Sequence, residues 1–155
     1  SSGGGGLQTF HPDAFTAIDS GSYRGSAWWT NDVYSAINND SAWFYGSKIR
    51  DTIPDTAVIL SAYIYIPIRA ININADGVMK MHTNSVKGST PPAWAGGPYN
   101  QLVPPAAGWH AIPTFWVDYM KANDAGIGFD TGGYWVAKGT AADAYTGALD
   151  ITYQA

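Results

Sequence analysis

The sequence contains no cysteine and no glutamate, and only 13% of its 155 residues are charged. The absence of cysteine excludes disulfide bridges and thiolate metal sites. Soluble domains usually carry about 25% charged residues, so neutral polar, glycine and aromatic side chains must cover much of this surface. All 12 acidic residues are aspartates, and aspartate favours turns and strand ends over long helices.

Positive charge is also scarce, with 8 Lys and Arg residues and a net charge of −4. There is no basic run, and the aromatic rings are not interleaved with positive charge, which disfavours nucleic acid as a partner. The longest apolar stretch, residues 58–68, is too short to cross a bilayer. We therefore expect no membrane insertion.

Glycine and aromatic residues are abundant instead, with 18 Gly, 10 Tyr and 7 Trp. A ring-rich, weakly charged exterior suits contact with carbohydrate or with identical subunits. Residues 1–8 include four consecutive glycines and are expected to form a flexible linker. The remaining residues, 9–155, are long enough for a single domain with its own core.

The pattern along the chain is mostly β. Residues 58–69 alternate with period two, and the even-numbered apolar residues are expected to face the core. Pro67 cannot donate to a ladder, which indicates an edge or a bulge. Beyond it the apolar positions shift to Ile71 and Ile73, which predicts a β-bulge at residues 69–70.

Other segments complete the expected fold. A hairpin turn is expected at Asp76-Gly77, and one short helix near 113–123. Residues 88–108 are rich in Pro and Gly and are expected to form a long ordered loop without regular structure. Further strands are expected at residues 15–18, 42–45, 78–83, 127–129, 134–137 and 149–153. The fold class is therefore mainly β: an antiparallel β-sandwich or jelly roll.

The sequence lacks the common catalytic motifs, including the nucleophile elbow, the zinc-protease helix and the P-loop. Glycoside hydrolysis needs two carboxylates. Asp118, Asp124 and Asp130 lie near one another, but capping of helices and turns is the simpler interpretation. We therefore expect no enzyme, and a glycan-cleaving activity ranks last.

Metal sites and cofactors are not expected either. His11, His82 and His110 are widely separated, and none has a ligand partner at helical or strand spacing. Asn31-Asp32 together with Asn38-Asn39-Asp40 suggests a calcium site but lacks the spacing of a known loop.

The aromatic residues give the strongest signal. Neighbouring residues on a strand point to opposite faces, so one of Trp28 and Trp29, and one of Tyr134 and Trp135, should be exposed. An exposed ring can stack on a sugar or anchor a subunit contact. Alternatively, the loop rings fold back into the core. These three interpretations remain open.

A binding site is expected where the 88–108 loop meets the segments around Trp109 and residues 134–135. The reasons are the length of the loop, because binding residues concentrate on loops, and the permissive turn Thr131-Gly132-Gly133. The expected ligand-binding residues are Trp94, Tyr99, Asn100, Trp109, Asp130, Tyr134 and Trp135.

Several short motifs follow one another in an order and spacing that resemble a known family. They are Ser22-Tyr23-Arg24-Gly25 with Trp28, Asp32-Val33-Tyr34, Trp43-Phe44-Tyr45-Gly46, Ser61-Ala62-Tyr63-Ile64-Tyr65-Ile66, Gly108-Trp109-His110, Gly126-Ile127-Gly128-Phe129 and Gly147-Ala148-Leu149-Asp150-Ile151-Thr152-Tyr153. Residues 13–155 resemble the C-terminal domain of minor tail and tail-fibre proteins of actinobacteriophages, a galactose-binding-like jelly-roll module.

The resemblance implies a homotrimeric receptor-binding module of the phage tail tip, located on the extracellular virion behind a stalk or other tail-tip proteins. Its partner would be a host cell-surface glycan. The resemblance implies no catalytic residues. The alternative is an assembly or decoration module whose aromatic residues lie at subunit contacts and which has no ligand.

Overall fold

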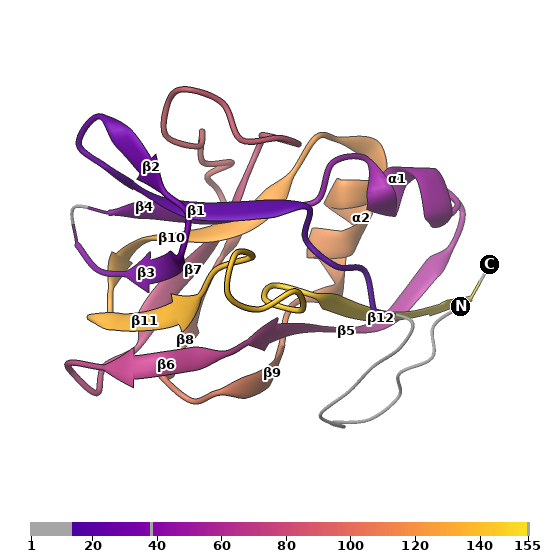
Figure 1. Ribbon diagram of the computed structural model, residues 1–155. Helices are drawn as coiled ribbons and strands as arrows, with labels where there is room; N and C mark the ends of the chain where they lie inside the picture. Colours follow the sequence, from indigo (N-terminus) through magenta and orange to yellow (C-terminus); the bar gives the residue numbers. More distant parts are fainter. Residues whose placement is uncertain (1–13, 38, 155) are drawn as a thin grey trace.

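The computed structural model describes residues 14–37 and 39–154 and is built mainly of β-strands (Figure 1). The predicted linker at 1–8, His11 and Asn38 lie outside the described residues. The elements in chain order are β1 (Asp19–Arg24), β2 (Ala27–Trp29), β3 (Asp32–Ser35), β4 (Asp40–Phe44), α1 (Lys48–Thr52), β5 (Val58–Ile66), β6 (Ile68–Ile71), β7 (Gly77–His82), β8 (Asn100–Val103), β9 (Gly108–Ala111), α2 (Thr114–Ala122), β10 (Gly126–Gly132), β11 (Trp135–Lys138) and β12 (Leu149–Gln154).

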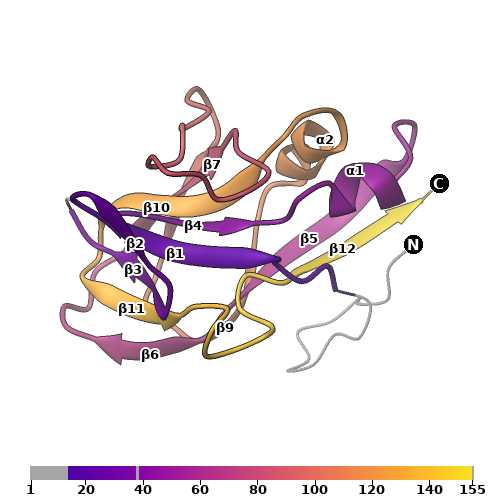
Figure 2. The ribbon, with the colours of Figure 1, turned by 45° about the horizontal axis from the view of Figure 1, so that its top comes forward.

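The strands form one six-stranded sheet and two three-stranded sheets. The six-stranded sheet has the order β2-β1-β4-β10-β7-β8, and the smaller sheets have the orders β3-β11-β6 and β12-β5-β9. Because only Pro67 separates β5 from β6, the two small sheets adjoin along one line of strands (Figures 1 and 2). Together they face the six-stranded sheet, and all described pairings are antiparallel. The predicted antiparallel β-sandwich is confirmed.

The hydrophobic core lies between these layers. The six-stranded sheet contributes Trp43, Met79, Met81, Ile127 and Phe129, and the small sheets contribute Val33, Ala62, Ile64, Ile66, Trp135, Ala137, Leu149 and Ile151. The Phe129 ring packs edge-on against Trp43 of the neighbouring strand, with centroids 5.7 Å apart, and against Trp135 of a small sheet across the core, with centroids 5.0 Å apart. Such pairs contribute about 0.5–1.5 kcal/mol each beyond the burial of their area.

The long apolar strand predicted at 58–69 is present but is divided at Pro67 into β5 and β6. Leu60 is an extra residue in the pairing of β5 with β12, so the alternation changes there. Val58 and Leu60 are consequently more than half exposed rather than core-facing as predicted. Beyond this bulge the even-numbered residues 62–66 do face the core.

A second bulge lies where the shifted apolar pattern predicted it. β11 pairs with Ala70 and then with Ile68, which leaves Arg69 without an opposite residue. The apolar residues beyond the bulge do not reach the core, because the sheet ends there: Ile71 and Ile73 are 50% and 52% exposed.

The N-terminal strand is displaced from its predicted position. Within residues 15–18 only Phe15 makes a bridge, to Leu149. The strand β1 instead covers the polar stretch 19–24, whose serines and glycine carry no apolar alternation. Tertiary pairing with β4 and β2, rather than local pattern, makes this segment a strand.

The predicted loop 88–108 contains two strands that the sequence did not reveal. Residues 100–103 form β8 at the edge of the six-stranded sheet, and β9 begins at Gly108. The irregular segment is therefore residues 83–99.

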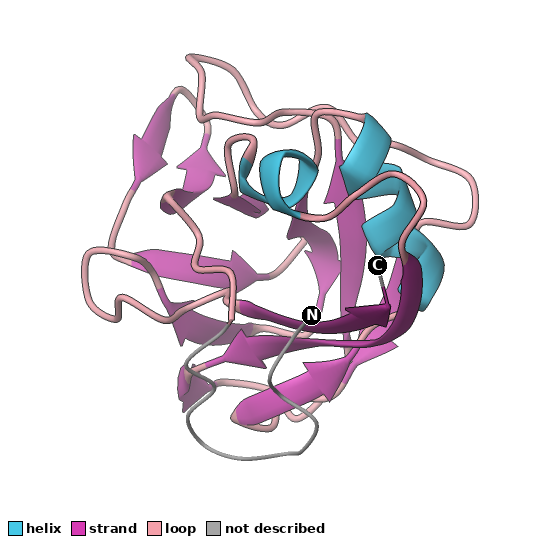
Figure 3. Ribbon diagram, turned by 90° about the vertical axis from the view of Figure 1, so that its right-hand side faces the viewer, coloured by secondary structure: helices cyan, strands magenta, loops and turns pink. Residues whose placement is uncertain are grey.

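The predicted helix is present as α2, and a second helix, α1, was not expected. The two helices lie together at one end of the sandwich (Figure 3). α1 buries Ile49 and has only five residues. A helix of this length is too short for a helical period to appear in the sequence. In the described part of the chain, no helix is long and apolar enough to cross a membrane.

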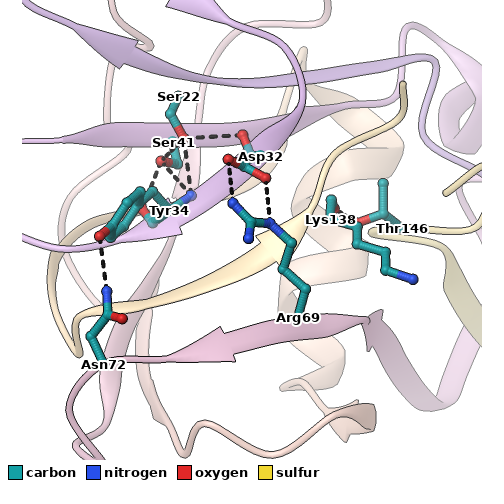
Figure 4. A network of polar contacts seen from close by, with 8 residues as sticks. All are labelled: Ser22, Asp32, Tyr34, Ser41, Arg69, Asn72, Lys138 and Thr146. Carbon is teal, nitrogen blue, oxygen red and sulfur yellow. Dashed lines mark hydrogen bonds and ion pairs between the residues drawn. The ribbon is translucent and has the colours of Figure 1, made fainter. Parts of the chain in front are cut away.

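Buried serines tie β3 to the six-stranded sheet (Figure 4). The Ser22 hydroxyl donates to the Asp32 carbonyl at 3.0 Å, and the Ser41 hydroxyl donates to the Tyr34 carbonyl at 2.7 Å. The Tyr34 N–H lies 3.0 and 3.1 Å from these two hydroxyl oxygens. Side-chain hydroxyls thus satisfy the edge of β3 that does not pair with β11.

The adjacent aromatic pairs divide between the two faces as predicted. Trp29 is 55% exposed and Trp28 is half-buried. Trp135 is fully buried and Tyr134 is 38% exposed. Tyr134 itself precedes β11 and has a left-handed backbone, with φ of 73°.

Candidate functional site

The side of the six-stranded sheet that faces away from the core carries a cluster of charged side chains. Asp40 of β4, Asp130 of β10 and Lys80 of β7 come from three neighbouring strands. Their neighbours Ser41, Phe129, Met79 and Met81 are buried, so strand alternation directs these three outward. With Trp94 and Asn100 they form what we call the outer-face site.

A β-bulge positions Asp130. β7 pairs with Phe129 and then with Thr131, which leaves Asp130 as the extra residue. Bulges redirect side chains and are frequent beside functional sites. Lys80 Nζ donates to Asp130 Oδ2 at 2.7 Å. Oδ1 of Asp130 is buried and accepts no hydrogen bond from the described residues, so this carboxylate retains an acceptor.

Two carboxylates share a single cation at this site. Burial raises the pKa of Asp40, and the negative charge of Asp130 raises it further. A hydrogen bond from the Trp94 side chain and the charge of Lys80 act in the opposite direction. Acceptors therefore outnumber positive charges, which suits a ligand rich in hydroxyl donors better than an anion.

His82 fixes the position of Trp94. Their backbones form a bridge, and their rings lie edge to face with centroids 6.2 Å apart. His82 Nε2 lies 2.9 Å from the Trp43 carbonyl oxygen, and Nδ1 accepts from the Asn84 N–H at 3.1 Å. A neutral ring with its proton on Nε2 satisfies both contacts. Burial lowers the pKa of His82 to about 4, so the ring is neutral at pH 7.

Hydrogen bonds at Gly88 and Ala95 hold the 83–99 segment on the outer face. The Ala95 N–H donates to the Met81 carbonyl at 2.9 Å. The Trp28 indole, from β2 at the far edge of the sheet, donates to the Gly88 carbonyl at 2.8 Å. The segment thus spans the sheet and holds Trp94 beside the charged cluster.

Three of the seven predicted ligand residues meet at the outer-face site: Trp94, Asn100 and Asp130. Trp94 donates to Asp40. Asn100 lies opposite Lys80 in the pairing of β8 with β7. Tyr99, Trp109, Tyr134 and Trp135 lie elsewhere.

Trp135 is a core residue rather than a ligand contact, because its ring is fully buried and its indole donates to the Ala75 carbonyl at 3.1 Å. Tyr134 lies beside β3, where its N–H donates to the Ser35 carbonyl. Neither residue is therefore part of the outer-face site.

Tyr99 and Trp109 are half-buried against neighbouring rings. Tyr99 lies against Phe115 and Tyr119 of α2, with centroids 5.5 and 4.8 Å away. Trp109 lies 5.3 Å from the Tyr65 ring of β5. Both rings therefore pack between elements, away from the outer-face site.

The sequence did not reveal Asp40 and Lys80 as members of the site. Lys80 alternates with two core methionines, which indicates only that it points outward. Nothing local pairs it with Asp40 and Asp130, which lie 40 and 50 positions away, because the order of β4, β10 and β7 is a property of the sheet.

The residues suggested for a calcium site are separated. Asp32 of β3 is held by Arg69 in a bidentate ion pair with N–O distances of 2.8 and 2.9 Å, whereas Asp40 lies at the outer-face site. Over residues 14–37 and 39–154, no group of three or more metal-ligating side chains comes together.

The three aspartates considered for a catalytic pair do not meet. Asp118 pairs with Lys121 at 2.9 Å, Asp124 pairs with Arg50 at 2.6 Å, and Asp130 pairs with the outer-face lysine. No side chain caps the start of α2. Ion pairing, rather than the expected capping, accounts for these residues.

Comparison of the chain with protein-family models, with curated proteins and with solved structures found no match.

Proposed function

We propose that the protein is a non-enzymatic binding module that attaches to a hydroxyl-rich cell-surface glycan at the outer-face site. The observation that carries the proposal is the cluster of Asp40, Asp130 and Lys80 beside Trp94, in which the Lys80 and Asp130 side chains remain 30% and 20% exposed. Sugar hydroxyls both donate and accept, so they need carboxylate acceptors and amide or ammonium donors side by side.

Each member has a distinct part in this proposal. The two carboxylates accept from sugar hydroxyls, and hydrogen bonds to ionised groups are about twice as strong as neutral ones. Lys80 and the Asn100 amide donate. Trp94 provides an apolar wall for the ring face of a sugar.

The biological setting comes from the family resemblance described above. It supports attachment of an actinobacteriophage tail tip to its host. In a homotrimer, three weak sites on one particle would act by avidity, which can raise overall affinity by about 10²–10⁴.

A glycan array with the purified domain tests the proposal. We expect a defined set of glycans to bind, and Trp94→Ala to weaken binding several-fold while unfolding stability stays within about 1 kcal/mol. Tyr145→Ala, which removes an exposed ring outside the outer-face site, is the control. An array on which no glycan binds, or equal binding by Trp94→Ala, would contradict the proposal.

The assembly alternative also has a specific observation in its favour. The loops and the end of β6 at one end of the sandwich expose Ile37, Ile71, Ile73 and Tyr134. Exposed apolar residues at one end suit a contact between identical subunits. Light scattering of Ile73→Asp against the wild type tests this alternative: a wild-type trimer that dissociates in the variant supports it, and a wild-type monomer contradicts it.

A further inference from the structure

The β1–β2 hairpin has aromatic side chains on both of its faces. Tyr23 and Trp28 lie on one face, and an aromatic cluster around Arg24 lies on the opposite face. Here the Arg24 guanidinium lies between two rings, with Cζ 4.5 Å from the Trp29 centroid and 5.0 Å from the Tyr34 centroid. We call Trp29, Arg24 and Tyr34 the arginine stack. It joins the edge of the six-stranded sheet to β3 of a small sheet.

Among the described residues, the guanidinium in this stack has no hydrogen-bond acceptor. The Arg24 side chain makes no hydrogen bond or ion pair with any of them, and its Nε atom is buried, so only the two Nη atoms can meet a ligand. A guanidinium carries five donors in a planar fork and is always charged. Cation–π contacts of about 0.5–2 kcal/mol orient the fork but satisfy none of its donors. Arg24 is therefore positioned to receive an acceptor from outside the chain.

The surroundings of the arginine stack are positive in a protein whose net charge is −4. Arg69 neutralises Asp32, and Lys138 lies opposite Asp32 in the pairing of β11 with β3 (Figure 4). The Lys138 ammonium is directed away from Asp32 in Figure 4, so the cations beside β3 are Arg24 and Arg69, against one carboxylate. This balance favours an anion, in contrast with the outer-face site.

Two further groups extend the polar surface beside Arg24. The Asn72 amide donates to the Tyr34 hydroxyl oxygen at 3.1 Å (Figure 4). The Tyr34 hydroxyl hydrogen is then directed to another acceptor. A ligand carboxylate bound to the Arg24 guanidinium would therefore lie on the same polar surface as the Tyr34 hydroxyl.

Trp29 adds an accessible ring to this charged surface. All seven tryptophans lie among the described residues, and Trp29 alone is exposed. One ring face is covered by Arg24, and its 55% exposure leaves the remainder open to a ligand. The Arg24 guanidinium and the Trp29 ring together suit a ligand that has both a carboxylate and an apolar face.

We propose that the arginine stack is a second binding site, for a carboxylate-bearing oligosaccharide such as a polyuronide. A carboxylate accepts two parallel N–H bonds from a guanidinium, which lysine cannot reproduce. A neighbouring sugar ring stacks on the exposed face of Trp29. This site uses no residue of the outer-face site and does not depend on the function proposed there.

Titration of the whole chain with tetragalacturonic acid, in parallel with a neutral tetramer of galactose, tests the site. We expect NMR shifts of the Arg24 Nε–Hε and Trp29 indole signals with the acidic tetramer only. By calorimetry, Arg24→Gln should weaken binding at least tenfold, and Arg24→Lys should also weaken it. Arg50→Gln, which removes an exposed arginine paired with Asp124, should leave affinity unchanged.

The proposal is overturned if the acidic tetramer does not bind, if the neutral tetramer shifts the Arg24 and Trp29 signals equally, or if Arg24→Gln retains full affinity. If Arg24→Gln fails to fold, the wild-type NMR shifts and the surface variant Trp29→Ala still decide the matter. Asp130→Asn separates the two sites, because it should weaken outer-face binding at least tenfold and leave the affinity for the acidic tetramer unchanged.

Discussion

At the scale of single residues, His82 links the stability of the fold to pH. Burial lowers the pKa of His82 from 6.5 to about 4, so between these values the unfolded chain binds a proton that the folded chain excludes. The His82 contribution is therefore complete above pH 6.5 and is lost as pH falls toward 4. It amounts to about 3 kcal/mol.

Urea unfolding at pH 7.5 and pH 4.5 measures this dependence. The wild type should lose more stability on acidification than His82→Gln, even though the variant is less stable at both pH values. Comparing the two pH slopes removes the contributions of the aspartates. Equal slopes would show that His82 does not titrate in this range.

The packing around the buried His82 ring also requires glycine at position 126. A Cβ at this position would overlap the His82 ring and lie 2.5 Å from the Trp43 carbonyl oxygen. Gly126→Ala should therefore destabilise the protein by about 2 kcal/mol or more in urea unfolding. Gly88→Ala is the matched control, because nothing lies within 4 Å of its added Cβ, and a change within about 0.5 kcal/mol is expected. Equal effects of the two substitutions would contradict this packing.

At the scale of elements, the serine contacts of β3 give a test of how the layers are joined. Ser41→Ala removes a buried acceptor of the Tyr34 N–H and a donor to the Tyr34 carbonyl. Leaving such groups unsatisfied costs about 1–3 kcal/mol. Amide hydrogen exchange at Tyr34 should accelerate, whereas Ser47→Ala, at an exposed serine, should not change it. Unchanged exchange in Ser41→Ala would show that β3 does not depend on this bond.

The same elements show what the sequence could and could not predict. Apolar alternation predicted the inner part of β5 and the bulge at Arg69, because burial on one face sets a period of two. It missed β1 and β3, whose polar residues become strands through partners far along the chain. It also missed α1, which is shorter than two helical turns.

At the scale of the whole molecule, the candidate site was predicted in part. Residue type and loop position pointed to Trp94, Asn100 and Asp130. The buried Trp135 looks the same in sequence as an exposed ring, because alternation shows that one member of a pair faces outward and not which one. Lys80 and Asp40 become neighbours of Asp130 only through the strand order of the assembled sheet.

The two proposed sites give the molecule different surfaces on its two faces. The outer-face site has two carboxylates and one lysine, whereas the arginine stack lies among cations. One face is therefore suited to neutral sugars and the other to acidic ones.

The affinity of the best glycan from the array for Asp130→Asn, measured by calorimetry beside the wild type, tests the central claim most directly. Asp130→Asn keeps the shape of the side chain but removes the charge and one acceptor. Asp124→Asn is the control, because this exposed aspartate pairs with Arg50 away from the site. We predict at least tenfold weaker binding for Asp130→Asn and less than a twofold change for Asp124→Asn. Equal affinities of the wild type and Asp130→Asn would contradict glycan binding at the outer-face site.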